Sequence, residues 1–423
     1  MKYTPLLFCL LCFHTFLYGQ PDTSREALAA KAGFCHLREE YKTAIRLYEQ
    51  AFAIKAPDPL EAYKAAEAYA LDNNTEKASY YLHIALEKGW TEADWLLSDP
   101  YFDHLRQTDP RQWKEITTIA IEREKQLEKT LRLPQVRKAI NQMVLNDQFL
   151  RRKRVLEKQP QQIALIDRQI QACDSTNLLK TQQIIRRYGW PLIRDIGKDG
   201  QNNLWLLVQH ADQYIPFQKK ALSLMEKFKG TDQINSENLA FLYDRVQCNL
   251  NHRQYYGTQV EWGENGSASG FRPIREEDKV NDRRKQMGMR PLSLYSLTYG
   301  FAYTNIDQVQ AMAQEQAATI RCKNWIDSAL LYYKIKAFSQ TYDYYNLAST
   351  IPDGMSNAEM HNAAVLFAKI FNETHEDKYA GISTDFLYLL FLRKYLTAGM
   401  LKNEPAFQQL HHQKWREISG QLK

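Results

Sequence analysis

EAYKAAEAYA, residues Glu61 to Ala70, recurs near the other end of the chain as EMHNAAVLFA, residues Glu359 to Ala368. A second pair follows in the same order, because LSDPYFDHL and QWKEI, which begin at Leu97 and Gln112, recur as LKNEPAFQQL and KWREI. Small and bulky apolar residues alternate at helical spacing in each copy. The sequence therefore predicts helical-hairpin modules at both ends, with a different block between them.

The N-terminal module, residues 22–118, has an internal period of 34 residues. Tetratricopeptide repeats have this period, with small residues where the two helices of a hairpin approach and large residues in the seam between hairpins. The module resembles that family over two repeats, and residues 301–423 resemble a degenerate version of it. The resemblance implies stacked hairpins that bind a partner. The repeating residues are Ala32, Leu37, Ala44, Leu47, Tyr48, Ala51 and Phe52, followed by Ala66, Leu71, Ala78, Tyr81, Leu82, Ala85 and Leu86.

A length of 423 residues is too great for one ordinary hydrophobic core. Between the two repeat modules, we expect connecting helices over residues 119–175 and a central domain over residues 176–300. Tyr256 to Trp262 and Phe271 to Ile274 are expected to form a small hairpin within that domain. The predicted fold class is mainly α, with helical-hairpin repeats at both ends and an α-rich centre containing one small β-hairpin.

The N-terminus predicts export through a signal peptide over residues 1–19. Lys2 precedes an apolar run from Pro5 to Phe16, which is typical of a signal-peptide core. This run is short for a membrane span, although a retained anchor is an alternative. No later segment is apolar for long enough to cross a membrane, so the mature protein is expected in the bacterial periplasm or secreted.

Export permits disulfides, and four cysteines remain after the predicted cleavage. These four allow three complete pairings, among which the sequence does not choose. Cys35 and Cys248 lie in helical apolar patterns and are interpreted first as small buried residues. The remaining cysteines are Cys173 and Cys322.

The formal charge of +6 arises from 55 basic and 49 acidic residues, which are mostly interspersed. Short basic clusters such as Arg151 to Arg154 are expected to be solvated helix faces. Nucleic-acid binding would need a basic stripe interleaved with aromatic residues, and no such stripe is found. The expected partner is a protein or peptide of the cell envelope, without nucleic acid and without a cofactor.

The central block contains five stretches that together resemble a bacterial domain family of unknown function. They are YGWP (188–191), WLLVQHAD (205–212), LYDRV (242–246), YYGTQ (255–259) and PIREEDKVNDRR (273–284). The resemblance implies a domain but assigns it no reaction.

Three residues in these stretches are candidates for catalysis. His210 and Asp212 end a helix that is otherwise uncharged, and an imidazole could serve as a general base with Asp212 or Asp244. A core histidine with satisfied ring nitrogens is the alternative. Asp244 and Arg245 are adjacent, so on a helix they point about 100° apart and each needs a partner from another element. Structural ion pairing is the alternative for both.

Four residues are candidates for ligand binding. Tyr256 and Gln259 flank a glycine and a threonine, which could form the lip of a ligand site or simply the start of a strand. Arg245 and Arg283 carry the cationic forks that bind anionic groups bidentately. His411 and His412 are too few ligands for a metal site, so no metal is expected.

The usual catalytic motifs are missing. The sequence has no His-Glu-x-x-His, Cys-x-x-Cys or phosphate-binding loop, and Gly266 to Gly270 has Ala268 where a nucleophilic serine would stand. The leading hypothesis is an exported interaction or scaffold protein with repeat arms around a ligand-binding or structural domain. An enzyme, possibly a hydrolase, with its site in the central domain is the alternative, and a purely structural envelope protein is a third possibility.

Overall fold

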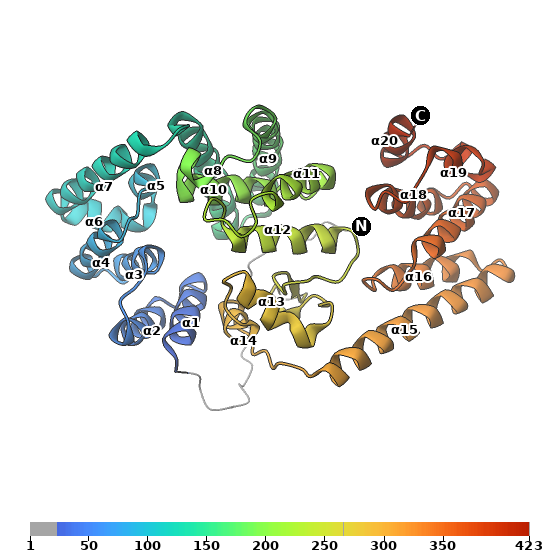
Figure 1. The fold of residues 1–423 in the computed structure, drawn as a ribbon, viewed down its shortest axis with the longest axis horizontal. Helices are drawn as coiled ribbons and strands as arrows, with labels where there is room; N and C mark the ends of the chain where they lie inside the picture. Colours follow the sequence, from blue (N-terminus) through green and yellow to red (C-terminus); the bar gives the residue numbers. More distant parts are fainter. Residues whose placement is uncertain (1–22, 265, 423) are drawn as a thin grey trace. The chain divides into compact units, whose positions relative to one another are not determined.

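The computed structural model describes residues 23–264 and 266–422, and the predicted signal peptide lies outside them. The chain is mainly α-helical with one small antiparallel β-hairpin (Figure 1), which confirms the predicted fold class. Among the described residues, no helix combines the length and apolarity that crossing a membrane requires. The four described cysteines form no disulfide with one another; Cys248 and Cys322 are buried, and Cys35 and Cys173 are half-buried.

The chain forms two compact units. The first unit comprises the residues up to Leu242 together with Val260–Phe271 and Asn281–Asn305. The second unit comprises Tyr243–Gln259, Arg272–Val280 and Ile306–Lys423. Residues of the central segment therefore contribute to both units.

The first unit begins with two hairpins, α1 (Arg25–Leu37) with α2 (Tyr41–Ile54) and α3 (Pro59–Leu71) with α4 (Thr75–Glu87). The start of each helix in the second hairpin is 34 residues after its counterpart in the first. The two turns also match, because Glu39 and Asn73 both adopt left-handed backbone with φ of 62° and 60°. The small residues of the period are buried at equivalent positions, which allows the helices of each hairpin to pack closely. These residues are Ala32, Ala44 and Ala51, and then Ala66, Ala78 and Ala85.

The start of α3 is fixed by local chemistry. The side chain of Asp58 accepts a hydrogen bond from the backbone of Glu61, whose side chain accepts one from the backbone of Asp58, and Pro59 occupies the first helical position. Glu61 also accepts a hydrogen bond of 2.7 Å from Arg25 on α1. One carboxylate therefore caps α3 and ties it to the preceding hairpin.

The remaining elements of the first unit follow in chain order. They are α5 (Ala93–Ser98), η1 (Pro100–Phe102), α6 (Asp103–Thr108), α7 (Pro110–Thr130), α8 (Pro134–Leu156), α9 (Pro160–Tyr188), α10 (Ile193–Gln209), α11 (Ile215–Glu226), much of α12 (Ser236–Asn249), β1 (Val260–Trp262), β2 (Ala268–Phe271), α13 (Val280–Gln286), α14 (Leu292–Tyr295) and η3 (Ser296–Tyr299). The hairpin pairs Val260 with Phe271. Its second strand, expected over Phe271 to Ile274, lies over Ala268–Phe271 instead, because the residues after Phe271 bond to Gln254 and Gln259. Tyr256 to Gln259 are not strand, because their backbone groups bind side chains instead.

Arg137 on α8 is fully buried and joins four segments of the first unit. Its guanidinium donates to Asp199 on α10 and, at 2.9 Å, to Glu124 on α7. It also donates to the carbonyl of Thr91, at 3.0 Å. Gly197 lies beside it with φ of 75°, a backbone conformation that kinks the start of α10 and that residues with a side chain rarely adopt. These bonds hold α8 between α7 and α10.

The second unit contains η2 (Glu277–Lys279), α15 (Gln308–Lys334), α16 (Phe338–Ser349), α17 (Asn357–Thr374), α18 (Asp377–Leu392), α19 (Ala398–Lys402), η4 (Pro405–Gln409) and α20 (Gln413–Gln421). Helices α15 and α16, and then α17 and α18, form antiparallel hairpins.

The internal echo in the sequence corresponds to repeated packing. In the first unit, the Phe102 ring packs edge-on against Tyr63, and its centre lies 6.0 Å from the ring centre of Trp113. In the second unit, the Phe407 ring packs edge-on against His361, and its centre lies 6.0 Å from the ring centre of Trp415. The short helices η1 and η4 that carry the two phenylalanines are both capped by a carboxylate and begin with proline.

The basic cluster on α8 is not the solvated face that the sequence suggested. Arg151 binds Asp147 and Asp174, and Arg154 donates a 2.6 Å hydrogen bond to Asp167. Arg152 donates to Asp99 at 3.2 Å. The guanidinium of Arg152 also lies over a ring from the N-terminal module, that of Tyr101. Acids of other helices and loops pair with these arginines, and the sequence alone does not show that proximity.

Two buried carboxyl groups lie beside Arg152 in the N-terminal module. Asp99 accepts hydrogen bonds from the Tyr63 hydroxyl at 3.0 Å and from Arg152. Glu67 lies 3.2 Å from Nε2 of His36. Burial raises the pKa of Glu67 to about 7 and that of Asp99 to about 7, and it lowers the pKa of His36 to about 4. Near neutral pH this cluster therefore holds a proton between its two acids, beside a neutral imidazole.

We expect E67Q to stabilise the protein at pH 8. The folded protein retains a proton that an unfolded chain releases between pH 4.5 and about 7, so stability falls as the pH rises through that window. A neutral amide at position 67 removes this loss and should raise the free energy of unfolding by about 1–3 kcal/mol at pH 8, with little effect at pH 4. Urea unfolding at both pH values measures the difference.

The matched control is E87Q, because Glu87 is exposed on α4. This variant should unfold like the unsubstituted protein at both pH values. Equal destabilisation by E67Q at pH 4 and pH 8 would show that Glu67 acts as a buried anion and would contradict the prediction.

Candidate functional site

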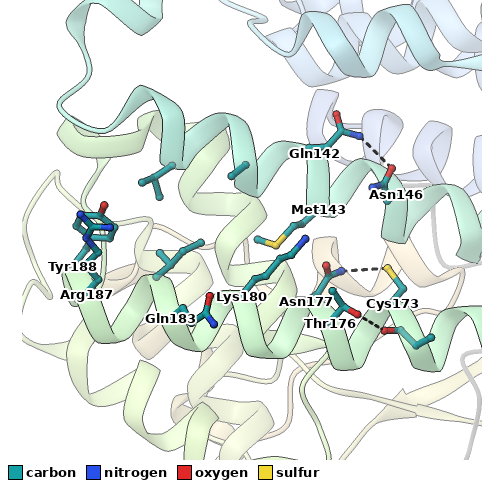
Figure 2. Close-up of a pocket in the computed structure, with 14 residues that line it drawn as sticks. Gln142, Met143, Asn146, Cys173, Thr176, Asn177, Lys180, Gln183, Arg187 and Tyr188 are labelled. Atoms are coloured by element: carbon teal, nitrogen blue, oxygen red, sulfur yellow. Dashed lines mark hydrogen bonds between the residues drawn. The ribbon is translucent and has the colours of Figure 1, made fainter.

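Helices α8 and α9 enclose a groove of about 730 Å³ in the first unit. Figure 2 shows the side chains of Met143 and Lys180 lying between the two helices. Arg187 and Tyr188 lie at one end of the groove, and Asn146 and Cys173 lie at the other. The groove extends along about three turns of α8, whose position is fixed by Arg137 on an adjacent face.

The lining of the groove combines an apolar floor with amides and cations. Val136, Ala139, Met143 and Ile184 supply apolar surface. The charged lining residues, Lys180 and Arg187, are both basic and exposed, and Arg187 lies 5.2 Å from the ring centre of Tyr188. The amide residues are Gln142, Asn146, Asn177 and Gln183. A groove lined in this way fits a ligand with carboxylates and backbone-like polar groups.

A cluster of ionisable residues lies next to the Asn146–Cys173 end of the groove. Asp147 follows Asn146 on α8, Asp174 follows Cys173 on α9, and His210 caps the end of α10. Nδ1 of His210 lies 3.1 Å from Oδ2 of Asp147. Arg151 bridges the two acids, with Nε 3.0 Å from Asp147 and one terminal nitrogen 2.6 Å from Asp174. The sequence candidate His210 thus has a carboxylate neighbour that the sequence analysis did not name.

The electrostatics of the two acids differ. Burial alone would raise the pKa of Asp147, but His210 and Arg151 hold that pKa below its ordinary value. Burial raises the pKa of Asp174, against the lowering effect of Arg151. Burial, Asp147 and Asp174 together raise the pKa of the neighbouring Cys173 thiol. Because the thiolate is the nucleophilic form, Cys173 is poorly suited to nucleophilic catalysis beside His210.

Asp244 lies in the second unit and organises a loop. It is buried, and its two carboxylate oxygens accept hydrogen bonds from the backbone N–H groups of Tyr255, Tyr256 and Thr258, at 2.7 to 3.1 Å, and from the Thr258 hydroxyl at 3.0 Å. Burial raises its pKa, and these donors act in the opposite direction. A carboxylate surrounded by donors from its own loop is suited to holding that loop.

The remaining sequence candidates fall into two groups. Tyr256 and Gln259 belong to the Asp244 loop, and the Gln259 side chain donates to the Thr258 hydroxyl at 2.9 Å. Arg245 is half-buried one residue beyond Asp244. In the first unit, Asp212 accepts a 3.1 Å hydrogen bond from Gln218, and Arg283 is buried on α13. The structure thus groups Asp244 with Tyr256 and Gln259, and groups His210 with Asp147 and Asp174.

We expect D244N to destabilise the second unit strongly. An amide nitrogen at either oxygen position would face backbone N–H groups, leaving buried donors without acceptors. The expected loss is about 2–4 kcal/mol in free energy of unfolding, measured by urea at pH 7. Asp343 is exposed on α16 in the same unit, so D343N serves as the control. A D244N protein with unchanged stability would leave Asp244 available for another role.

His411 and His412 have a carboxylate neighbour. Oδ1 of Asp377 lies 3.1 Å from Nε2 of His411 and 3.3 Å from Nε2 of His412. Asp377 and His411 are exposed, so water competes for each of these groups.

Asp147 and Asp174 did not stand out in the sequence, because α8 and much of α9 have the pattern of charged connecting helices, and Arg151 was expected on a solvated face. One signal was available. Ile140, Met143 and Val144 form an apolar stripe, and Asp147 continues that stripe at the next helical step. A carboxylate on a buried helical face requires a hydrogen-bond or ion-pair partner, so an acid in an apolar stripe predicts a polar cluster.

Comparison with protein-family models finds one match. Residues 134–306 are similar to DUF6624, a family of unknown function. The match includes α8, α9 and His210, and it agrees with the expected resemblance of the central block to an uncharacterised domain. No curated protein and no solved structure matches the chain in the corresponding comparisons.

Proposed function

We propose that this protein is an exported helical scaffold that binds an acidic segment of a partner protein in the groove between α8 and α9. The observation that carries the proposal is the lining of that groove, in which cations and amide side chains surround an apolar floor. The groove lies within the part of the chain that is similar to the family of unknown function.

The chemistry of the lining supports a peptide rather than a small apolar ligand. A bound peptide segment needs partners for its backbone N–H and C=O groups, and asparagine and glutamine side chains offer both donors and acceptors. Lys180 and Arg187 are suited to acidic side chains or a terminal carboxylate. Met143 and Ile184 give apolar surface for the side chains between them, and methionine adapts to different shapes.

The flanking hairpins and the N-terminus complete the proposal. The 34-residue spacing of α1 to α4 supports a tetratricopeptide-like arm, and α15 to α18 would be a degenerate counterpart. Such arms add binding surface. Export by a signal peptide over residues 1–19 would place the partner in the cell envelope. N-terminal sequencing of the protein isolated from its own cells tests the cleavage expected before Gln20.

The binding experiment uses a photo-crosslinking amino acid at position 183, on the edge of the groove. The crosslinked partner is identified, and the crosslinked segment is synthesised as a peptide. We expect this peptide to be acidic, to bind the unmodified protein, and to bind about tenfold more weakly to K180E/R187E, because two charge-assisted contacts become repulsive. Fluorescence anisotropy at two salt concentrations measures the affinity, which should fall as salt rises.

The control is R168E, which reverses one positive charge on an exposed part of α9 outside the groove. This variant should bind the peptide like the unsubstituted protein. A crosslinked segment without acidic groups, or equal weakening by R168E and K180E/R187E, would contradict the proposal.

A further inference from the structure

Three helices bring Asp147, Asp174 and His210 together in a metal-ligand arrangement. One ligand atom from each side chain, two carboxylate oxygens and one imidazole nitrogen, lies within 4.8 Å of the other two. Asp147 comes from the middle of α8, Asp174 from the middle of α9, and His210 from the end of α10. Residues on three packed helices hold their positions better than residues on one loop.

Burial and bonding within the cluster favour a bound cation. The Asp147 side chain is only 2% exposed, so it needs compensating charge, which Arg151 supplies in this structure; Gln148 also donates to its Oδ2, at 2.7 Å. Nδ1 of His210 is buried and lies 3.1 Å from Oδ2 of Asp147. This convergence of an imidazole nitrogen on a carboxylate oxygen is suited to coordination of a common ion.

We propose that Asp147, Asp174 and His210 bind a divalent transition-metal ion, and that Arg151 is the internal cation that this ion displaces. An imidazole with two carboxylates suits Zn²⁺ or Mn²⁺, whereas Mg²⁺ and Ca²⁺ prefer oxygen ligands alone. The site is separate from the groove lining, so it does not depend on peptide binding.

Arg151 is the member of the cluster best placed to turn into solvent. It lies one helical turn from Asp147 on α8, and its side chain is 29% exposed. Its two ion pairs use the same two carboxylates that would bind the metal, so the guanidinium and the ion compete directly.

The Asp377, His411 and His412 cluster is the other grouping of this kind among the described residues, and it is a weaker candidate. Asp377 is 69% exposed, so it must be ordered and desolvated before it can bind. To keep this second grouping from contributing, the binding measurements use an H411Q/H412Q background.

The experiment titrates Zn²⁺ into the protein in that background by calorimetry at pH 7.5, and Co²⁺ with visible absorption as the readout. We expect one ion per chain and an absorption band that H210Q alters, because H210Q removes the nitrogen ligand. D174N should weaken Zn²⁺ binding by about tenfold or more through loss of a ligand. R151Q should tighten it by about fivefold, because the competing cation is removed.

The matched control for R151Q is R154Q. It removes the same charge from the same helix, but Arg154 binds Asp167 and not the cluster. Circular dichroism confirms that each variant is folded. Equal affinities for R151Q and R154Q, unchanged binding in D174N, or the absence of binding to the unsubstituted cluster would show an ion-pair network only and would overturn the proposal.

Discussion

The buried guanidinium of Arg137 is the interaction on which the first unit depends. It accounts for the placement of α8, because it bonds to α7, to α10 and to the chain just before α5. Removing one partner of such a buried pair leaves an uncompensated charge, which costs about 3–5 kcal/mol. The groove and the Asp147 cluster both include residues of α8, so Arg137 contributes to their geometry by placing that helix.

Helix α8 also carries the contact between the proposed site and the N-terminal hairpins. Arg151 faces Asp174 on α9, whereas the next residue, Arg152, binds Asp99 and covers Tyr101. The two neighbouring arginines therefore bind different groups. Arg151 binds the Asp147 cluster, and Arg152 binds Asp99, one of the two buried acids of the N-terminal module. A proton held by Glu67 and Asp99 reduces the negative charge that Arg152 must balance. The protonation of the hairpin module and the anchoring of α8 are thus physically linked.

The sequence predicted the fold at both ends and much less of the site. Alanines at fixed intervals indicate close helix packing, because the two helices of a hairpin are neighbours in the sequence. The equivalent residues Phe102 and Phe407 are recognisable for the same reason. Side chains that interact across long sequence separations produce no such periodic pattern. His210 was singled out, but its neighbour Asp147 is far away in the chain on a helix interpreted as a connector. The Asp244 loop was also hidden, because its donors are backbone N–H groups that any residue supplies.

Two carboxylates with similar burial can have opposite roles, and their donors distinguish them. Asp244 is satisfied by backbone N–H groups of its own loop, which are fixed and have no alternative orientation. Asp147 is satisfied partly by Arg151, a long side chain that can turn into solvent and be replaced by another cation. Fixed donors make a carboxylate a structural anchor, whereas an exchangeable cation makes it a potential ligand. This difference, rather than pKa or burial alone, is why binding is assigned to the Asp147 cluster and loop stability to Asp244.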